Sequence, residues 1–269
     1  MARKIGFIGV GNMASAIIGG ITSSKGTVAF EDIVLYDFFP EKCAAFAEKG
    51  AQVAVSEASV AQSSDVIVLA VKPQNFPEVL SALSDVDGIS QKLIVTIAAG
   101  ITVETVSSAL HGAPVIRVLP NTPMLIGMGV SVICRSDVVG KDDFDFVVSM
   151  FEASGSVVLI DEAEMNRYIS VTSSSPAYIF AVIKAICDGA SAQGLAGDTL
   201  MPAVCDMVIG AATLLKEGGK TPDEQIATVT SKGGTTERAM AVLREQNLYG
   251  MFADAMQACT DRAEELSAK

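Results

Sequence analysis

The first 160 residues contain a series of short apolar runs rich in β-branched residues, and this series constrains the fold more than any other feature. The runs are continuously apolar instead of alternating, which is typical of strands covered on both faces of a sheet. Stretches with helical spacing fill the gaps between them. The predicted strands are 4–9, 32–37, 51–55, 65–71, 92–98, 114–120, 129–135 and 156–160, and the predicted helices are 12–23, 40–49, 57–63, 75–84, 102–110 and 140–153. This βαβ alternation predicts an α/β fold with a doubly wound, mainly parallel sheet.

Strand-like runs stop at about residue 160, and the remainder is rich in Ala, Met and Leu with helical spacing. The predicted helices there are 162–171, 176–193, 197–216, 222–229, 235–246 and 248–267. We therefore expect two domains, an α/β domain at 1–160 and an all-helical domain at 161–269. Apolar residues such as Phe180, Met207 and Ile209 occur on most faces of the second set of helices. A domain of this size cannot bury them all, so we expect a homodimer or larger homo-oligomer built through it.

The chain has 19 basic and 31 acidic side chains, for a net charge of -12, and such an acidic balance disfavours binding to nucleic acid. Apolar stretches are broken, as by Pro202 and Asp206, so we expect no membrane span. The N-terminal apolar run is too short and Gly-rich for a good signal peptide. Five cysteines without a C-x-x-C pair suit free thiols in a reducing compartment, so a cytoplasmic protein without a metal site is expected.

A glycine-rich turn follows the first predicted strand. Gly9, Gly11 and Ala14 form the pattern G-x-G-x-x-A, and the turn opens a helix. The first glycine allows a tight turn, the second lets backbone approach a diphosphate, and the small third residue lets helix and strand pack closely. Asn12 and Met13 would offer N–H groups at the positive helix end. The pattern predicts that residues 1–160 form a dinucleotide-binding domain; a glycine turn without a ligand is the alternative.

Asp37 ends the second predicted strand, near the separation at which an acidic residue reaches the adenosine ribose of a bound dinucleotide. A carboxylate there would repel a 2′-phosphate, and no Lys or Arg occurs between it and Lys42. We therefore expect NADH or NADPH as cofactor, with Asp37 favouring NADH. The alternative is that Asp37 only caps the next helix.

Three further loops end predicted strands at the edge where open α/β sheets bind ligands. We expect cofactor contacts from six loop residues, which are Ala70, Lys72, Pro73, Ala98, Gly100 and Asn121. The small residues at 98–100 suit backbone lying against a flat nicotinamide ring. A solvated lysine at Lys72 and a plain rigid turn around Asn121 are the alternatives.

Two segments of the helical part are rich in hydroxyl residues. Residues 171–178 place three serines before Pro176, and residues 230–239 place two glycines among four hydroxyl residues before another helix. The second segment would form a cradle of N–H groups suited to a carboxylate. Each also reads as an ordinary capped helix start.

Taken together, these motifs resemble pyrroline-5-carboxylate reductases along essentially the whole chain. The matching stretches are IGFIGVGNMASAI, LAVKPQ, IAAGIT, RVLPNTP, SPAY and SKGGTT, in the family's order. The resemblance implies a Rossmann domain, a helical domain through which chains dimerise, and reduction of L-1-pyrroline-5-carboxylate to L-proline with NAD(P)H. It also implies that Thr236 hydrogen-bonds the ring nitrogen of the substrate. The carboxylate cradle would be Ser231, Gly233, Gly234 and Thr235.

The chain departs from the family pattern at four positions, one of which is Asp37, where members that prefer NADPH commonly have a small or basic residue. Ser173 and Ser175 stand where the family usually has glycine, and Lys232 stands where it has proline. Serine would strain the backbone if either position needs a positive φ. Two other functions stay open at this point. A β-hydroxyacid dehydrogenase or related imine reductase would use a lysine with Asn one turn later, but here Lys184 is followed by Asp188. A non-catalytic dinucleotide-binding regulator is the other.

Overall fold

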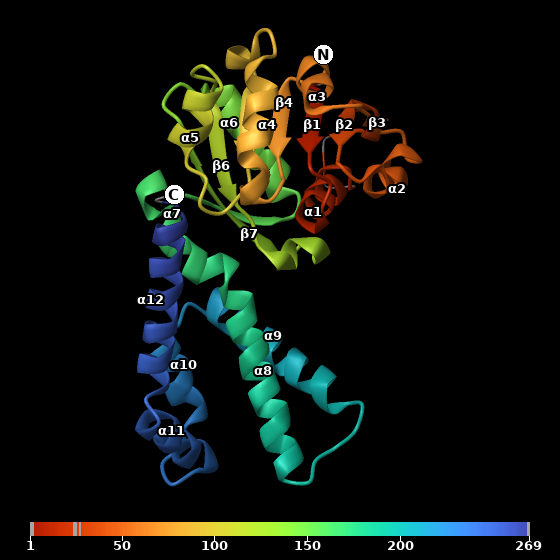
Figure 1. Cartoon of the computed structure of the whole chain (residues 1–269). Coiled ribbons are helices and arrows are strands. Elements are labelled where there is room, and N and C mark those ends of the chain that lie inside the picture. Colours follow the sequence, from red (N-terminus) through yellow and green to blue (C-terminus); the bar gives the residue numbers. More distant parts are fainter. Residues whose placement is uncertain (1–2, 24–25, 27, 268–269) are drawn as a thin grey trace. The chain divides into compact units, whose positions relative to one another are not determined.

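The protein is described by a computed structural model that covers residues 3–23, 26 and 28–267 (Figure 1). It forms two compact units. The first contains the described residues up to Ser174 together with those from Cys259 onward, and the second is Ser175–Ala258.

The first unit contains, within its described residues, a sheet of eight strands in the order β3-β2-β1-β4-β5-β6-β7-β8. Neighbouring strands are parallel except β6 and β7, which are antiparallel. The strands are β1 (Ile5–Ile8), β2 (Ile33–Tyr36), β3 (Gln52–Val53), β4 (Val66–Leu69), β5 (Leu93–Thr96), β6 (Val115–Leu119), β7 (Gly129–Arg135) and β8 (Gly155–Leu159). Each overlaps a run predicted from the sequence, although β8 begins one residue before its predicted run at 156–160, and the mainly parallel sheet is confirmed.

Helices cover both faces of this sheet (Figure 1). They are α1 (Asn12–Ile21), α2 (Ala44–Ala47), α3 (Glu57–Ser63), α4 (Phe76–Ser84), α5 (Val103–Ala109) and α6 (Lys141–Glu152). Successive side chains of a strand point to opposite faces, so β1 supplies both layers. Phe7 belongs to the core with Ile17 of α1 and Phe151 of α6, whereas Ile8 belongs to the core with Leu83 of α4. Burial on both faces explains why the strands are continuously apolar.

The compact units do not follow the predicted division between residues 160 and 161. Helix α7 (Met165–Tyr168) and the π-helical turn η7 (Ile169–Ser173) belong to the first unit. So does the last part of α12 (Leu248–Ser267), a helix within which the unit boundary falls. The physical reason is packing, because Met165 is fully buried in the same core as Ile8.

The second unit consists of helices. They are α8 (Ser175–Ala192), α9 (Leu200–Gly218), α10 (Pro222–Val229), α11 (Thr235–Glu245) and the first part of α12. Helix α8 packs along α9. Among residues 175–258, all of which are described, Val204 alone is buried. Large apolar side chains stay exposed on α8 and α9, including Phe180 at 64%, Ile209 at 57% and Leu214 at 58%. The unit therefore lacks a hydrophobic core within one chain, as the sequence predicts.

One helical segment in the described part of the chain, Glu162–Ala192, is long and apolar enough to cross a membrane by length and composition. Its first residues belong to the sheet unit, where Met165 is buried, and a π-helical turn and Pro176 interrupt its regular hydrogen bonding. Its apolar character suits a helical interface between protein chains.

Candidate active site

The parallel strands bring the predicted cofactor loops to one edge of the sheet, because carboxyl ends of parallel strands lie on the same side. The loops follow β1, β2, β4, β5 and β6 (Figure 1). These loops contain all the residues that we predicted to bind cofactor, except that Asn12, Met13 and Ala14 open the helix after the first of them. The site is built from this edge upward.

The turn after β1 has the geometry that its two glycines predict. Gly9 has φ +92, and a Cβ there would lie 2.9 Å from the backbone carbon and oxygen of Ala70. Any other residue would therefore be strained and would collide with the neighbouring strand end. Gly11 is the N-cap of α1 and has no side chain to accept from the first turn. A Cβ on Gly11 would meet nothing within 4 Å, so open space lies where a ligand would approach the backbone.

Helix α1 begins immediately after Gly11, next to this open space. Asn12 and Met13 are its first two residues, and its first turn contains no acidic side chain. The third small residue of the motif, Ala14, is 1% exposed and packs into the core with Phe7. First-turn N–H groups at a positive helix end favour a diphosphate. These residues therefore fit the diphosphate of a dinucleotide.

Asp37 has partners that the sequence did not reveal. Its carboxylate accepts hydrogen bonds from the N–H of Val10 at 2.8 Å and of Phe39 at 2.9 Å, and Lys42 Nζ lies 3.1 Å from Oδ1. Burial alone would raise the pKa of Asp37, but the two N–H donors and Lys42 lower it below its ordinary value. Its side chain is 8% exposed. The expected NADH preference was argued from the lack of Lys or Arg between Asp37 and Lys42; the structure pairs Lys42 itself with Asp37, and the preference for NADH stays a prediction.

The loops after β4 and β5 present mostly backbone. The N–H of Ala70 donates to the Ile8 carbonyl at 2.9 Å, while Lys72 and Pro73 are exposed. Ala98 is 7% exposed, and its side chain belongs to the core rather than to the loop surface. Gly100 rests against α12, because a Cβ there would lie 3.4 Å from that of Leu266.

Both the nitrogen and the oxygen of the Asn121 side-chain amide make hydrogen bonds within the protein. Nδ2 donates to the carbonyl of Thr172 at 3.0 Å, and Oδ1 accepts from the N–H of Val130 at 2.8 Å. The residue four positions after Thr172 is Pro176, which has no N–H to offer that carbonyl. Asn121 thus supplies the donor that proline removes. Its side chain holds the turn after β6 against η7, and the expected cofactor contact of Asn121 stays a prediction.

The serines that replace family glycines fit without backbone strain. Among the described residues, the non-glycine positions with positive φ are His111 and Asn247, so neither Ser173 nor Ser175 is among them. Ser173 lies in the π-helical turn and donates to the Pro120 carbonyl at 3.4 Å. The strain considered for these serines is therefore absent.

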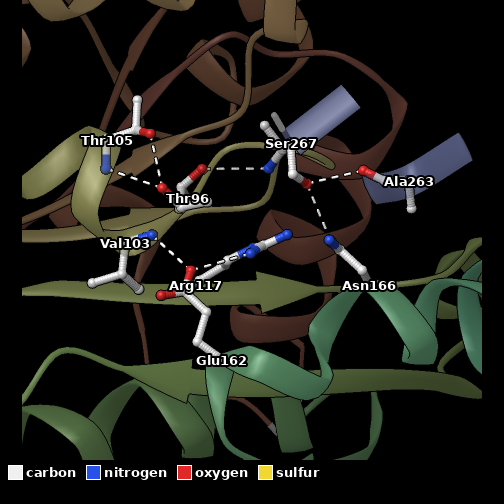
Figure 2. Close-up of polar contacts among 10 residues, drawn as sticks. Thr96, Val103, Thr105, Arg117, Glu162, Asn166, Ala263 and Ser267 are labelled. Carbon is white, nitrogen blue, oxygen red and sulfur yellow. Dashed lines mark hydrogen bonds and ion pairs between the residues drawn. The ribbon is translucent and has the colours of Figure 1, made fainter. Parts of the chain in front are cut away.

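An ion pair between a buried arginine and a partly exposed glutamate lies beside the loop after β5 (Figure 2). Arg117 is 3% exposed, and its Nη1 lies 3.1 Å from Oε1 of Glu162. The same carboxylate oxygen accepts from the N–H of Val103 at 2.7 Å. Sequence reasoning missed this pair. Its signal was a single charge within the apolar run that forms β6, because a buried arginine needs an anionic partner.

The predicted substrate residues lie in the second unit, at the start of α11. Gly233 has φ +72, a conformation that favours glycine. Gly234 caps α11 without a side chain, and its N–H donates to the Ser231 carbonyl at 2.9 Å. Thr235 and Thr236 are the first two residues of α11, and Thr236 is half-buried.

This cradle is only partly open to a ligand. The N–H of Gly233 donates to Glu237 Oε2 at 2.7 Å, so that amide is already used within the unit. Lys232 is exposed. The glycine cap, the first turn of α11 and the two threonine hydroxyls still form an N-terminal site of the kind that binds carboxylates.

Comparison with known proteins covers both units. A family model described as "Pyrroline-5-carboxylate reductase dimerisation" matches residues 162–266, and one described as "NADP oxidoreductase coenzyme F420-dependent" matches residues 4–100. The pyrroline-5-carboxylate reductase of Escherichia coli (strain K12) is 36% identical over 269 residues, covering 99% of each chain. That of Methanosarcina acetivorans is 35% identical over 269 residues, with the same coverage.

Solved structures agree with these sequence relatives. A pyrroline-5-carboxylate reductase from Coxiella burnetii superposes with a TM-score of 0.90 at 31% identity, covering 99% of each chain. The Plasmodium falciparum pyrroline carboxylate reductase with NADP bound shares the fold at a TM-score of 0.88 and 23% identity, covering 98% of each chain. With the motifs of both units in place, this chain belongs to the pyrroline-5-carboxylate reductase family.

Proposed function

We propose that this protein reduces L-1-pyrroline-5-carboxylate to L-proline with NAD(P)H. The observation that carries the proposal is full-length relationship to reductases of that name, at 36% identity over 99% of the chain. The glycine turn with its open first helical turn supports a dinucleotide at the sheet edge.

The first unit holds the cofactor in this proposal. Backbone N–H groups of Gly11, Asn12 and Met13 bind the diphosphate at the start of α1, where Gly9 and Ala14 let the backbone approach. The pair Asp37 and Lys42 lies toward the adenosine end. The backbone of residues 98–100 lies along the nicotinamide, and Ala70, Lys72 and Pro73 line the same edge. Asn121 contributes by holding the turn after β6.

The second unit binds the substrate. The start of α11 holds the carboxylate through Ser231, the first-turn N–H groups that follow the Gly234 cap, and the Thr235 hydroxyl. Gly233 shapes this cradle by its positive φ. Thr236 Oγ1 accepts a hydrogen bond from the protonated ring nitrogen of the cyclic iminium. Because such an imine is basic enough to arrive protonated, these groups orient it and need no strong general acid.

When bound, the reduced nicotinamide supplies the hydride that the C=N carbon of the substrate accepts. The electron pair of the C=N π bond then stays on nitrogen, which keeps its proton. The task of the chain is to align the two ligands and to exclude water.

Helix α8 of this chain lacks the lysine followed by Asn one turn later that the rival β-hydroxyacid dehydrogenase class would use. Lys184 is exposed and pairs with Asp188 at 2.5 Å one turn later on α8. This hydrogen bond raises the pKa of Lys184, which keeps it a protonated surface side chain. A reductive aminase from Aspergillus terreus shares the fold at a TM-score of 0.59 and 15% identity, which concerns the fold alone.

The experiment follows oxidation of NADH and of NADPH with pyrroline-5-carboxylate and identifies proline as the product. A panel of β-hydroxy acids in the reverse direction tests the rival enzyme class. A folded, cofactor-binding sample that forms no proline at saturation would refute the proposal. A regulator would bind cofactor and turn over neither substrate class.

The proposed setting is a cytoplasmic homodimer, or a larger homo-oligomer, assembled through the helical domain at 161–269. A dimerisation family model that matches residues 162–266 supports the assembly. The acidic net charge of -12 argues against nucleic acid as a partner.

A further inference from the structure

The turn between β5 and α5, residues 97–102, is fastened at three points, all within the first unit. At its start, the N–H of Ala98 lies 3.4 Å from Thr96 Oγ1. In its middle, Gly100 contacts Leu266 of α12. At its end, the N–H of Val103, the first residue of α5, donates to Glu162 at 2.7 Å. The third point comes from a residue beyond the sheet.

Glu162 is itself held by Arg117 (Figure 2). Arg117 lies in the middle of β6, opposite Thr96 on β5 and Cys134 on β7. Burial, with a smaller effect of Glu162, raises the pKa of the Cys134 thiol to about 12, so the thiol stays neutral and cannot compensate the guanidinium. Nη2 of Arg117 is buried without a hydrogen-bond partner. The Glu162 carboxylate therefore supplies the negative charge that balances the guanidinium of Arg117, which is 3% exposed.

Because Arg117 holds the Glu162 carboxylate in place, this carboxylate is a well-positioned acceptor for the Val103 N–H. The Glu162 side chain is 33% exposed, and without a partner it would sample many rotamers. The ion pair with Arg117, a residue of β6, restrains it to one geometry. The helix containing Asn166 follows Glu162 directly, and Ser267 Oγ donates to Asn166 Oδ1 at 3.3 Å. The end of α12 that contacts Gly100 is thus tied to the same segment as Glu162.

We propose that Glu162 is a positioning residue for hydride transfer, which fixes the β5–α5 turn through the N–H of Val103. The inference rests on the proposed function, in which the backbone of this turn lies along the nicotinamide. Glu162 touches neither substrate nor cofactor in this proposal. Arg117 acts one step further away, by holding the Glu162 carboxylate.

The test compares two double variants that both lack the ion pair. Arg117→Met with Glu162→Gln keeps an amide oxygen for the Val103 N–H, whereas Arg117→Met with Glu162→Leu removes it. Both avoid the unpaired buried guanidinium that the single change Glu162→Gln would leave. Glu104→Gln, on an exposed side chain in the first turn of the same helix, is the matched control.

The Gln double variant is expected to keep kcat and the Kd for NADH and NADPH within about threefold of the unmodified protein. The Leu double variant should lose up to about tenfold in kcat or in cofactor affinity relative to the Gln double variant, the scale of one hydrogen bond between neutral groups. Amide exchange at Val103 should be about tenfold faster in the Leu variant than in the Gln variant. Glu104→Gln should change none of these values.

Equal kcat, cofactor Kd and Val103 exchange in the two double variants would overturn the inference, as would a melting temperature that falls with no change in kinetics. Failure of the proposed function has a different signature, because the unmodified protein would then form no proline. Cofactor titration by fluorescence and Val103 amide exchange still test Glu162 in that case.

Discussion

Lys42 lowers the net negative charge that Asp37 presents at the end of β2, where we propose that the adenosine of the cofactor binds. The ammonium lies 3.1 Å from one carboxylate oxygen and 3.4 Å from the other, and it also lies 4.8 Å from the centre of the Phe39 ring. The pair is partly exposed, with Lys42 at 43%. A partly exposed lysine can exchange a carboxylate for a phosphate at small cost. The pair is thus compatible with either NADH or NADPH.

Changing the two members of this pair should shift cofactor preference in opposite directions. Asp37→Asn keeps an oxygen for the Val10 N–H and frees the lysine, so kcat/KM for NADPH should rise about three- to tenfold relative to NADH. Lys42→Met leaves the carboxylate uncompensated and should lower that ratio by a similar factor. Lys49→Met, another lysine over an aromatic ring, is the control. Unchanged ratios in both variants would exclude the pair as a determinant of preference.

Thr236 is the residue whose loss should separate chemistry from binding. Thr236→Val keeps the β-branched shape and removes the hydroxyl that we place at the ring nitrogen. The expected result is a loss of about 5- to 150-fold in kcat, corresponding to about 1 to 3 kcal/mol for one hydrogen bond, with cofactor Kd unchanged.

The matched control for that change is Thr213→Val on α9. The Thr213 hydroxyl donates to the Ile209 carbonyl within its own helix and should not affect turnover. Steady-state kinetics with both ligands varied provides the measurement. Thr236→Val with wild-type kcat would mean that the threonine serves only the start of α11.

At the scale of elements, the junction between η7 and α8 depends on a side chain from another part of the fold. Pro176 removes a backbone donor from a helical segment, and Asn121 replaces it from the end of β6. Asn121 is 7% exposed, so water does not readily take over. Its position at the end of a sheet strand links that edge to η7.

Removing this amide should destabilise the first unit, and restoring a backbone donor should repair part of the loss. Asn121→Ala leaves the Thr172 carbonyl and the Val130 N–H without partners, for an expected loss of about 2 to 4 kcal/mol in the free energy of unfolding. Adding Pro176→Ala supplies an N–H four residues after Thr172.

A double-mutant cycle by urea unfolding measures the coupling between these two changes. The double variant should be about 1 kcal/mol more stable than additivity predicts, since one of the two lost hydrogen bonds is replaced. Strict additivity would show that Asn121 and the proline act independently. Asn75→Ala, on an exposed asparagine before α4, controls for a general effect of asparagine loss.

At the scale of the whole molecule, the two units have different sources of stability. The sheet unit has cores on both faces, whereas in residues 175–258 only Val204 is buried. Apolar residues left exposed along α8 and α9 would otherwise promote aggregation. A second chain that covers them would supply the missing core.

The full-length protein should therefore have a mass of at least twice the 27.9 kDa of one chain. Ile209→Glu places a charge on an exposed apolar face of α9 and should shift the protein toward monomer, with loss of turnover. Val55→Glu, at a residue that is 88% exposed on the sheet unit, should leave the mass unchanged. Sedimentation equilibrium measures both, and a concentration-independent mass of one chain in the unmodified protein would refute the dimer.

Truncation at residue 160 is a poor test of that assembly. Such a fragment would keep Arg117 but lose Glu162, leaving a buried guanidinium without a carboxylate. It would also lose Met165 from the core. Surface substitutions in the full chain avoid both effects.

The order and position of the strands, the glycine turn and the helical character of the last hundred residues could be predicted from the amino-acid sequence alone. These features depend on local patterns, namely continuous apolar runs, helical spacing and the chemistry of Gly9 and Gly11. Parallel topology then placed the loops on one edge, because strands linked by helical crossovers have the same direction. The candidate cofactor loops could therefore be identified before any contact was known.

Which of those loop residues have free side chains depends on contacts between distant parts of the chain, and these contacts form only in the folded protein. The bonds of Arg117 to Glu162 and of Asn121 to Thr172 join residues 45 and 51 positions apart, and no local pattern specifies such a pairing. The place of Met165 in the sheet unit likewise depends on how α7 packs. Even Lys42, five residues from Asp37, had to be placed by the fold, because a flexible side chain takes its partner from the surroundings that packing creates.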